Sequence, residues 1–350
     1  MNSTINAKSV LDFALLQSAA ECYLHGLHSG STTTDIKDKL KEGANNALLQ
    51  GKSAEDPLLA SATRFTDQQA EWFTANYEIV THYPNDSSGF SATLFRNKYT
   101  GEYTLSFRST EYQFQEKGGD FERDGSSATD GDINTHGYAL AQLSSMENFY
   151  AHLKQGETLN TEGQWVANPD VAAFASDTPV LNVTGYSLGA HLATSFTLMH
   201  AEDVTATWNF NAAGVGGISV AGSENTIPTG EGIKALIDFY DVLMNYDGTV
   251  PDSPLWNELV MTSPFLGTFI NTAASIRGQD FNNVYDNPLH VVVMDMLAEK
   301  MYPSGAGVVL DSDDGMGDAR LWDAIYRFNP NDLNSFSSDL FEVGGNTTNP

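Results

Sequence analysis

The hydrophobic positions of the chain change their period near residue 90. Before that point, apolar residues recur at helical spacing over residues 9–27 and 35–49, and Thr66-Asp67-Gln68-Gln69 has the pattern of a capping box that begins a third helix. Beyond it, apolar and polar residues alternate over 90–94 and 103–107, on either side of a Gly-containing turn, which predicts a β-hairpin. We therefore expect a helical N-terminal part over residues 1–80, followed by strands.

Strand and helix patterns alternate from this hairpin to residue 217. The helical spacing of residues 140–153 is followed by a strand, a helix that ends near His200, and an alternating strand over 206–210. Residues 116–132 are polar, rich in Gly and Asp and without period, so we expect a loop there. This order favours the α/β class, with a mostly parallel sheet flanked by helices.

The second half of the chain has a weaker pattern. Residues 236–243, 255–260 and 289–301 have helical spacing, and loops rich in Asp, Pro and Gly separate them. No linker divides the chain, so we expect one domain over residues 1–350. Its tail, residues 330–350, has the Asn, Ser, Asp and Gly content typical of flexible segments.

One stretch places a serine between a strand and a helix. Gly185-Tyr186-Ser187-Leu188-Gly189 matches the G-x-S-x-G pattern of a nucleophile elbow, and it has a short apolar strand before it and a helix after it. The serine backbone of such an elbow is strained, and side chains at the glycine positions would collide with the strand and the helix. We interpret Ser187 as a nucleophile, and a plain strand–turn–helix connection is the alternative.

A serine nucleophile needs a histidine base and a carboxylate that orients it. On sheets of this type the acid and then the histidine follow the serine in the chain. His191 and His200 lie on the helix after the serine and are poorly placed, which leaves His290 as the expected base, or else a plain histidine at a helix start. Asp247, in an Asp-Gly turn, is the expected acid, and the competing residues are Asp238, Asp241, Asp252 and Asp286.

The tetrahedral intermediate of acyl transfer needs two hydrogen-bond donors directed at its oxyanion. The backbone N–H of Leu188, directly after the nucleophile, is the expected first donor. The second comes from a loop after an earlier strand, and Thr110, which follows the second hairpin strand, is the candidate. Simple termination of the strand is the alternative interpretation of Thr110.

Together these motifs resemble a class 3 (fungal-type) lipase domain, and bacterial members related to phospholipases A1 are the most similar. The resemblance covers about residues 85–220 and is carried by Phe107–Glu111, Asp130–Ile133, Gly137–Ala139, Val183–Ala193 and Asn209–Gly216. It implies an α/β-hydrolase fold, acyl-ester hydrolysis, Ser187 as the nucleophile and Thr110 as an oxyanion donor. The segment Tyr246–Pro251 is similar to the acid loop of the family, which implies Asp247 as the acid.

The chain departs from the family pattern at three places. Ser109 stands where the family usually has glycine, and Tyr186 stands where it more often has histidine. The sequence around His290 does not resemble the histidine loop of the family. Some bacterial relatives carry this histidine near the end of a longer domain, and the acid would then lie later in the chain, for example at Asp318 or Asp332.

Composition excludes some partners. The net charge of −28 argues against nucleic acid and discourages binding to anionic membranes, so at most peripheral contact with lipid surfaces is expected. No stretch approaches the roughly 20 apolar residues of a membrane helix. The N-terminus lacks a signal-peptide pattern. We expect secretion without such a signal rather than a cytoplasmic protein.

Metal-binding patterns are weak. Asp130-Gly131-Asp132 begins like a calcium loop but lacks the glycine at the sixth position, so we expect no required cofactor, with structural calcium left open. The expected function is that of a serine carboxylic-ester hydrolase, a lipase or phospholipase A1, whose substrate is a lipid or other ester. Two alternatives remain: another acyl-ester enzyme (polyesterase, thioesterase or acyltransferase), and a non-catalytic hydrolase-like binding domain.

Overall fold

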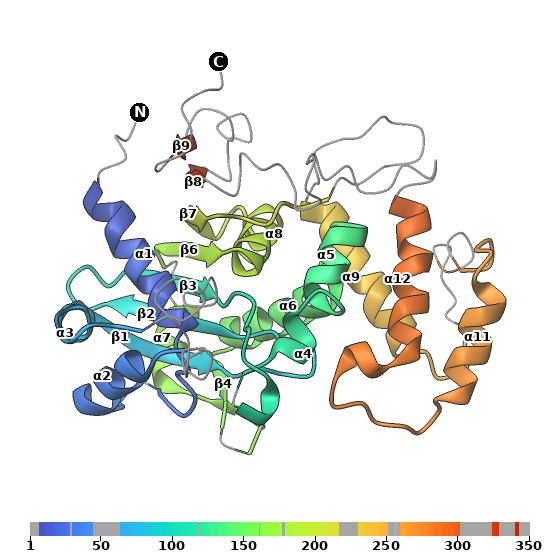
Figure 1. The fold of residues 1–350 in the computed structure, drawn as a ribbon, viewed down its shortest axis with the longest axis horizontal. Helices are drawn as coiled ribbons and strands as arrows, with labels where there is room; N and C mark the ends of the chain where they lie inside the picture. The colour runs from blue at the N-terminus through green and yellow to red at the C-terminus, as the bar shows by residue number, and fades with distance from the viewer. Residues whose placement is uncertain are drawn as a thin grey trace, which may run out of the picture.

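A mixed sheet forms the centre of the computed structural model (Figure 1). The residues described are 7–28, 30–44, 64–117, 119–160, 162–176, 179–216, 230–250, 256, 260–301, 324–328 and 340–342. Within them, a 7-stranded sheet has the order β1-β2-β3-β6-β7-β8-β9. These strands are β1 (Tyr77–Tyr83), β2 (Ala92–Asn97), β3 (Tyr103–Phe107), β6 (Leu181–Tyr186), β7 (Val204–Phe210), β8 (Ala324–Phe328) and β9 (Leu340–Glu342). A separate hairpin joins β4 (Glu157–Leu159) to β5 (Trp165–Ala167).

The parallel part of the sheet lies at its centre. Strands β3, β6 and β7 pair in parallel, so their carboxyl ends meet at one edge. The outer pairs, β1 with β2, β2 with β3, β7 with β8 and β8 with β9, are antiparallel. The predicted hairpin of β2 and β3 is thus confirmed, whereas the mostly parallel character expected of the sheet is confined to its central strands.

Helices cover both faces of the sheet. Trp208 of β7 packs against Phe13 of α1 on one face, and Thr207, the preceding residue of β7, bonds Thr197 of α8 on the other. Successive side chains of a strand point to opposite faces, so α1 and α8 lie on opposite sides of the sheet. The helices are α1 (Ala7–Glu21), α2 (Thr33–Glu42), α3 (Asp67–Asn76), α4 (Phe121–Asp124), α5 (Thr129–His136), α6 (Leu140–Lys154), α7 (Pro169–Ser176), α8 (Leu188–Met199), α9 (Gly230–Met244), α11 (Leu266–Ser275) and α12 (Pro288–Met301).

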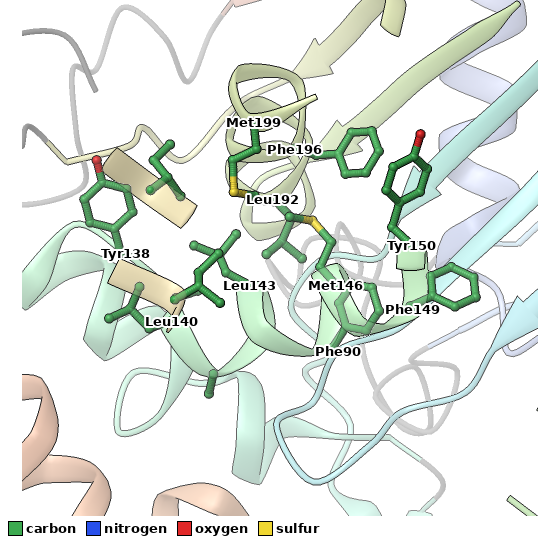
Figure 2. Close-up of a cluster of buried hydrophobic side chains, with 14 of the residues drawn as sticks. Phe90, Tyr138, Leu140, Leu143, Met146, Phe149, Tyr150, Leu192, Phe196 and Met199 are labelled. Atoms are coloured by element: carbon green, nitrogen blue, oxygen red, sulfur yellow. The ribbon is translucent and has the colours of Figure 1, made fainter. Parts of the chain in front are cut away.

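The main core fills the space between the sheet and the helices on the α8 side. Figure 2 shows Leu143 and Met146 of α6 beside Leu192 and Phe196 of α8, all fully buried. This contact fixes α8 against the sheet, because burial of such side chains contributes about 1.5–3 kcal/mol each. A smaller core joins α1, α2 and α3 to the outer strands. The predicted capping box at Thr66 begins α3.

Two expectations about local structure are wrong. The segment 116–132, expected to be a loop, contains α4 and the first part of α5, and Tyr77–Val80 belongs to β1 rather than to the helical part over residues 1–80. Helix α5 has no apolar period because polar contacts hold it, and β1 has no alternation because it is buried on both faces. Strand β9 lies within the tail, 330–350. Residues 45–49, 217, 255 and 257–259, which lie in segments with predictions, are outside the described part of the chain.

Among the described residues, no helix combines the length and the apolar character that crossing a membrane requires.

Candidate active site

Ser187 occupies a strained turn between β6 and α8. Its backbone has φ 50° and ψ −117°, in the region of positive φ that residues with a side chain rarely adopt. The end of β7 holds it there, because the Ser187 N–H donates to the Phe210 carbonyl at 3.1 Å and the Ala213 N–H donates to the Ser187 carbonyl at 3.1 Å. The side chain is half-buried at the carboxyl edge of the parallel strands. Such strain persists only where the surroundings over-determine it, as they do at functional sites.

The two glycines of the motif permit this turn by close approach. A Cβ atom on Gly185 would lie 2.1 Å from the Gly189 carbonyl oxygen, and one on Gly189 would lie 2.4 Å from the Phe107 carbonyl oxygen. Both neighbours are backbone atoms, which cannot rotate away. The spacing of the motif is therefore a packing requirement, and it brings the start of α8 against the end of β3.

Three carboxylates hold the loop that follows β3. The backbone N–H of Ser109 donates to Glu21 at 3.2 Å, and that of Glu111 donates to Asp124 at 2.9 Å. Between them, the Thr110 hydroxyl donates to Asp130 at 3.0 Å. Each of the three successive residues is thus fixed by a carboxylate from a different helix or its end.

Two backbone N–H groups at this edge have no hydrogen-bond acceptor among the described residues. Leu188 begins α8, so its N–H has no acceptor within the helix. Within the described chain, neither this N–H nor that of Thr110 donates to another residue. Both follow the carboxyl ends of adjacent parallel strands, β3 and β6. This is the arrangement expected of an oxyanion hole.

Helix α5 spans the same edge of the sheet. At its start, Asp130 accepts from the Thr110 hydroxyl beyond β3, and just after its end the Gly137 carbonyl accepts from the Gly216 N–H beyond β7. Eight helical residues extend about 12 Å, and β3 and β7, with β6 between them, lie about 10 Å apart. The helix therefore bridges the carboxyl ends of β3 and β7, on either side of β6. Burial raises the pKa of Asp130 to about 6.

The hydrogen-bond partners of His290 are not the expected Ser187 and Asp247. It is buried in the first turn of α12, with Nε2 2.9 Å from a carboxylate oxygen of Asp132 and Nδ1 2.9 Å from the Tyr240 hydroxyl. Its ring therefore has two partners, and neither is Ser187 or Asp247. The carboxylate at His290 is that of Asp132, which precedes the serine in the chain. The rule that the acid follows the serine excluded this residue, although it lies within the Asp130–Ile133 motif.

Asp247 lies on the surface, away from the contacts of His290. Its carboxylate accepts from the Thr249 N–H at 2.8 Å, and this hydrogen bond holds the pKa of Asp247 below its usual value. An exposed Asx turn of this kind accounts fully for an aspartate in an Asp-Gly-Thr sequence. The structure thus does not bring Asp247 to His290. Of the competing acids, Asp241 accepts from Ser144, Asp238 and Asp286 have no bond to His290, and Asp252, Asp318 and Asp332 are outside the described residues.

His191 and His200 have structural partners. The His191 Nδ1 lies 2.8 Å from the Gly214 carbonyl, and its Nε2 accepts from the Ala139 N–H at 3.2 Å. A carbonyl can only accept, so Nδ1 carries the proton and the ring is neutral; burial lowers its pKa to about 4. His200 ends α8, about 18 Å of helix from Ser187, and bonds Glu147.

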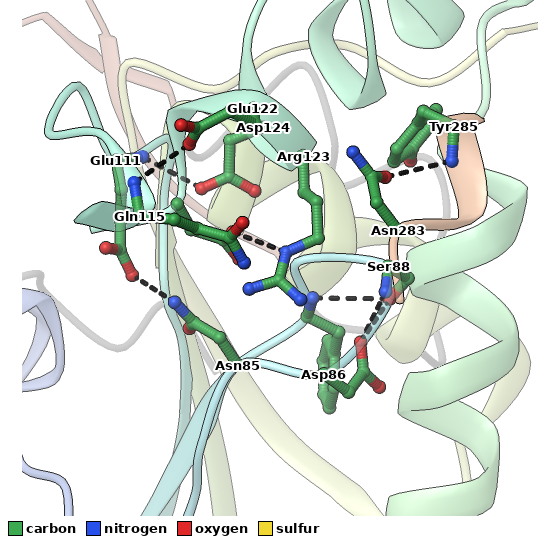
Figure 3. Close-up of polar contacts among 12 residues, drawn as sticks. Asn85, Asp86, Ser88, Glu111, Gln115, Glu122, Arg123, Asp124, Asn283 and Tyr285 are labelled. Atoms are coloured by element: carbon green, nitrogen blue, oxygen red, sulfur yellow. Dashed lines mark hydrogen bonds and ion pairs between the residues drawn. The ribbon is translucent and has the colours of Figure 1, made fainter. Parts of the chain in front are cut away.

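A buried group of charges lies beside the loop that follows β3, and Figure 3 shows two of its members, Glu111 and Arg123. Arg108 pairs with Glu111 at 2.9 Å, and Arg123 pairs with Asp120. Asn85 donates to the other side of this group, at Glu111. Burial raises the pKa of Asp120 to about 7, against the opposing effect of Arg123. The group therefore holds a proton on Asp120 over much of the acid range.

This proton gives a stability prediction. Between about pH 4 and 7, folded Asp120 keeps a proton that the unfolded chain has released, so stability falls as pH rises through this window and levels off above it. From pH 5 to 7, we expect Asp120→Asn to reduce this fall by about 1–2 kcal/mol. Urea unfolding at pH 5, 6, 7 and 8 measures it. The control is Glu122→Gln, an exposed carboxylate on α4, which should keep the wild-type slope; an unchanged slope in Asp120→Asn would contradict the assignment.

One group in the described residues has metal-ligand spacing. His200, Glu202 and Asp203 bring their ligand atoms within 4.8 Å of one another. His200 is bonded to Glu147, and Asp203 accepts from Tyr150 and lies 3.2 Å from the Lys154 ammonium. These contacts already use His200 Nε2 and both carboxylate oxygens of Asp203. Asp130-Gly131-Asp132 lies in α5 and not in a calcium loop, and structural calcium stays a prediction.

The structure therefore groups Ser187 with the free N–H groups of Leu188 and Thr110, and separately pairs His290 with Asp132. Within the described residues, the Ser187 hydroxyl makes no hydrogen bond to a histidine ring; the His191 backbone N–H donates to the Ser187 carbonyl at 3.2 Å. The chain matches no protein-family model and no curated protein.

Proposed function

We propose that the protein is a serine carboxylic-ester hydrolase of the α/β-hydrolase type that acts on lipid esters, as a lipase or a phospholipase A1. The observation that carries this proposal is the positive φ of Ser187 at the carboxyl end of a parallel strand. A serine held in this strained position, with unpartnered N–H groups beside it, has no structural purpose that a glycine would not serve better.

The mechanism follows from the placement of these groups. The Ser187 hydroxyl oxygen attacks the ester carbonyl carbon, and the carbonyl oxygen becomes an oxyanion that accepts from the N–H groups of Leu188 and Thr110. The C–O bond of the leaving alcohol then breaks, and the alcohol takes the proton that the serine gave to the base. Water repeats the attack on the acyl-enzyme and releases the acid.

His290 is the proposed base, and Asp132 replaces Asp247 as its carboxylate partner. In this role the His290 ring exchanges the Tyr240 hydroxyl for the serine hydroxyl during the reaction and keeps Asp132. Retention of the other partner keeps the ring oriented. Asp132 stabilises the imidazolium that forms when the serine proton is taken.

Aromatic side chains beside the elbow favour an apolar acyl group. Tyr112 and Phe114 follow residues 108–111 after β3, which form the proposed oxyanion loop, and Tyr186 directly precedes the nucleophile; all three are 41–49% exposed. Tyr112 interacts electrostatically with both Tyr186 and Asp130, so these side chains lie near one another. Phe114 is joined to Tyr112 through Phe121, which contacts both rings. Exposed aromatic side chains beside a nucleophile provide apolar area for an acyl chain to cover.

Removal of these rings should change chain-length preference. We expect Tyr112→Ala combined with Phe114→Ala to lower kcat/KM for p-nitrophenyl decanoate about tenfold, and to leave p-nitrophenyl acetate within about twofold. The control is Tyr99→Ala, because Tyr99 is exposed at the β2–β3 turn, at the opposite end of β3 from Ser187. An equal loss for both esters would contradict an acyl-binding role.

A second candidate is a non-catalytic binding domain that keeps the fold. The partners of His290 favour it, because neither ring nitrogen faces Ser187 in the structure. Reaction of the folded protein with a fluorophosphonate probe separates the two candidates. Labelling at Ser187 supports the enzyme, whereas a folded protein that is not labelled would support the non-catalytic binding domain.

A panel of p-nitrophenyl esters, phospholipids and thioesters then distinguishes the lipase from other acyl-ester enzymes. Full turnover by His290→Ala would contradict the role of His290 as the base and would leave Ser187 as the proposed nucleophile.

A further inference from the structure

The N-terminal helix α1 is bonded to the end of β3 through two residues on one face. Gln17, which is buried, donates to the Phe107 carbonyl at 2.8 Å and accepts from the Ser106 hydroxyl at 2.8 Å. Glu21, one turn later, is the last residue of α1 and reaches the next residues of the chain beyond β3. These contacts join segments about 90 residues apart, so α1 is part of the structure around the oxyanion loop.

The Glu21 carboxylate accepts hydrogen bonds from two residues, Ser109 and Gln17. The Ser109 N–H lies 3.2 and 3.3 Å from its two oxygens, and the Ser109 hydroxyl donates at 3.1 Å. The Gln17 amide donates at 2.7 Å. An ionised carboxylate accepts all of these bonds at once, whereas a protonated one loses an acceptor position and would have to donate to the Ser109 hydroxyl instead of accepting from it.

The other side of the loop is fixed in the same way. Asp124 accepts from the Glu111 N–H at 2.9 Å, so the two N–H groups on either side of Thr110 both donate to carboxylates. The N–H of Thr110 is the one between them that donates to no described residue. The carboxylates thus set the peptide orientation on each side of the proposed oxyanion donor.

We propose that Glu21 is a positioning residue, which holds the loop so that the Thr110 N–H faces the carbonyl oxygen of the substrate. This inference rests on the proposed ester hydrolase. Glu21 touches no reacting atom and acts through Ser109. A displacement of about 1 Å in a catalytic group lowers the rate by up to about 100-fold, so loss of one of the two carboxylate anchors should be measurable in kcat.

Ionisation of Glu21 should appear in the pH profile. Burial raises its pKa to about 7, and the neighbouring Arg108 opposes this rise. Arg108 pairs with Glu111 and also donates to the Glu21 carbonyl, and the remaining groups that face Glu21 are Cys22, Gln17 and Ser109. Since the ionised form of Glu21 accepts all the hydrogen bonds from Ser109 and Gln17, kcat should rise with pH through about 7.

The test compares Glu21→Ala, Glu21→Gln and the control Asp12→Ala on the full chain. Asp12 lies on α1 and pairs with Lys8 at the surface, so its loss leaves the loop intact. For p-nitrophenyl butyrate at pH 8, we expect Glu21→Ala to lower kcat about 10- to 100-fold with KM within about twofold. Glu21→Gln can still accept from the Ser109 N–H and can donate to its hydroxyl, so kcat should recover to within about fivefold of wild type.

The pH profile distinguishes positioning from a merely structural role. The ratio of wild-type to Glu21→Gln kcat should rise from about 1 at pH 5.5 to about fivefold at pH 8.5, because only wild type gains the carboxylate. A constant ratio overturns the proposal. If Glu21→Ala does not fold, this ratio alone decides. An inactive, unlabelled wild type would refute the ester hydrolase itself, whereas an active wild type with a fully active Glu21→Ala would refute only the role of Glu21.

Discussion

Ser187→Ala should abolish ester turnover and fluorophosphonate labelling while the fold is retained. The hydroxyl is the only group lost, and alanine at φ 50° is no more strained than serine, so the free energy of unfolding should change by less than about 0.5 kcal/mol. Removal of a serine nucleophile lowers kcat by about 10⁴-fold or more. Measurements of p-nitrophenyl ester turnover, intact mass after probe treatment, and urea unfolding together give the result.

A matched control lies on the helix that begins at this serine. Ser195 is buried within α8, and its hydroxyl has no hydrogen-bond partner among the described residues. Ser195→Ala should keep full labelling and turnover. Labelling of Ser187→Ala at the wild-type rate would place the reactive group elsewhere in the chain and would sink the proposed nucleophile.

Alanine at either glycine of the elbow should have the largest effect on stability. The added Cβ of Gly185→Ala would meet the Gly189 carbonyl oxygen at 2.1 Å, and that of Gly189→Ala would meet the Phe107 carbonyl oxygen at 2.4 Å. Relief of either clash must separate α8 from β3 or distort β6, which also displaces Ser187 and Leu188. We expect a loss of more than about 4 kcal/mol in the free energy of unfolding, by urea denaturation, or no soluble protein.

The control for this prediction is a glycine with open space. A Cβ on Gly267, near the start of α11, has nothing within 4 Å. Gly267→Ala should stabilise the protein by about 0.5–1 kcal/mol, because alanine restricts the unfolded chain and favours the helix. A destabilisation by Gly189→Ala no larger than about 1 kcal/mol would show that α8 can move away from β3 without cost, and would contradict the packing role of the motif.

The sequence was most informative where structure depends on nearby residues. The hairpin of β2 and β3, the capping box at Thr66 and the strand–turn–helix around Ser187 each have a recognisable pattern within one short stretch of sequence. The position of Thr110 after β3 could be predicted for the same reason. Thr110 and Ser187 lie at the same edge of the sheet because β3 and β6, which precede them, are parallel neighbours.

Contacts between distant segments could not be predicted. Asp132 and His290 are 158 residues apart, and the sequence has no local pattern that joins them. Glu21 and Ser109 are 88 residues apart, and the helical pattern of residues 9–27 gave no sign that the end of α1 binds the loop after β3. The turn at Asp247 fits the expected acid, but an Asp-Gly turn has the same sequence whether it faces a histidine or solvent.

The backbone of Ser187 also limits how this protein can be engineered. The residue occupies a conformation that glycine adopts without strain, and the two hydrogen bonds to the end of β7 keep it there. Selection for heat resistance alone would therefore favour glycine at this position, or changes that let the turn relax, and either change discards the nucleophile. Thermostability and activity are in direct conflict at this single residue, so a library sorted by melting temperature should hold position 187 constant.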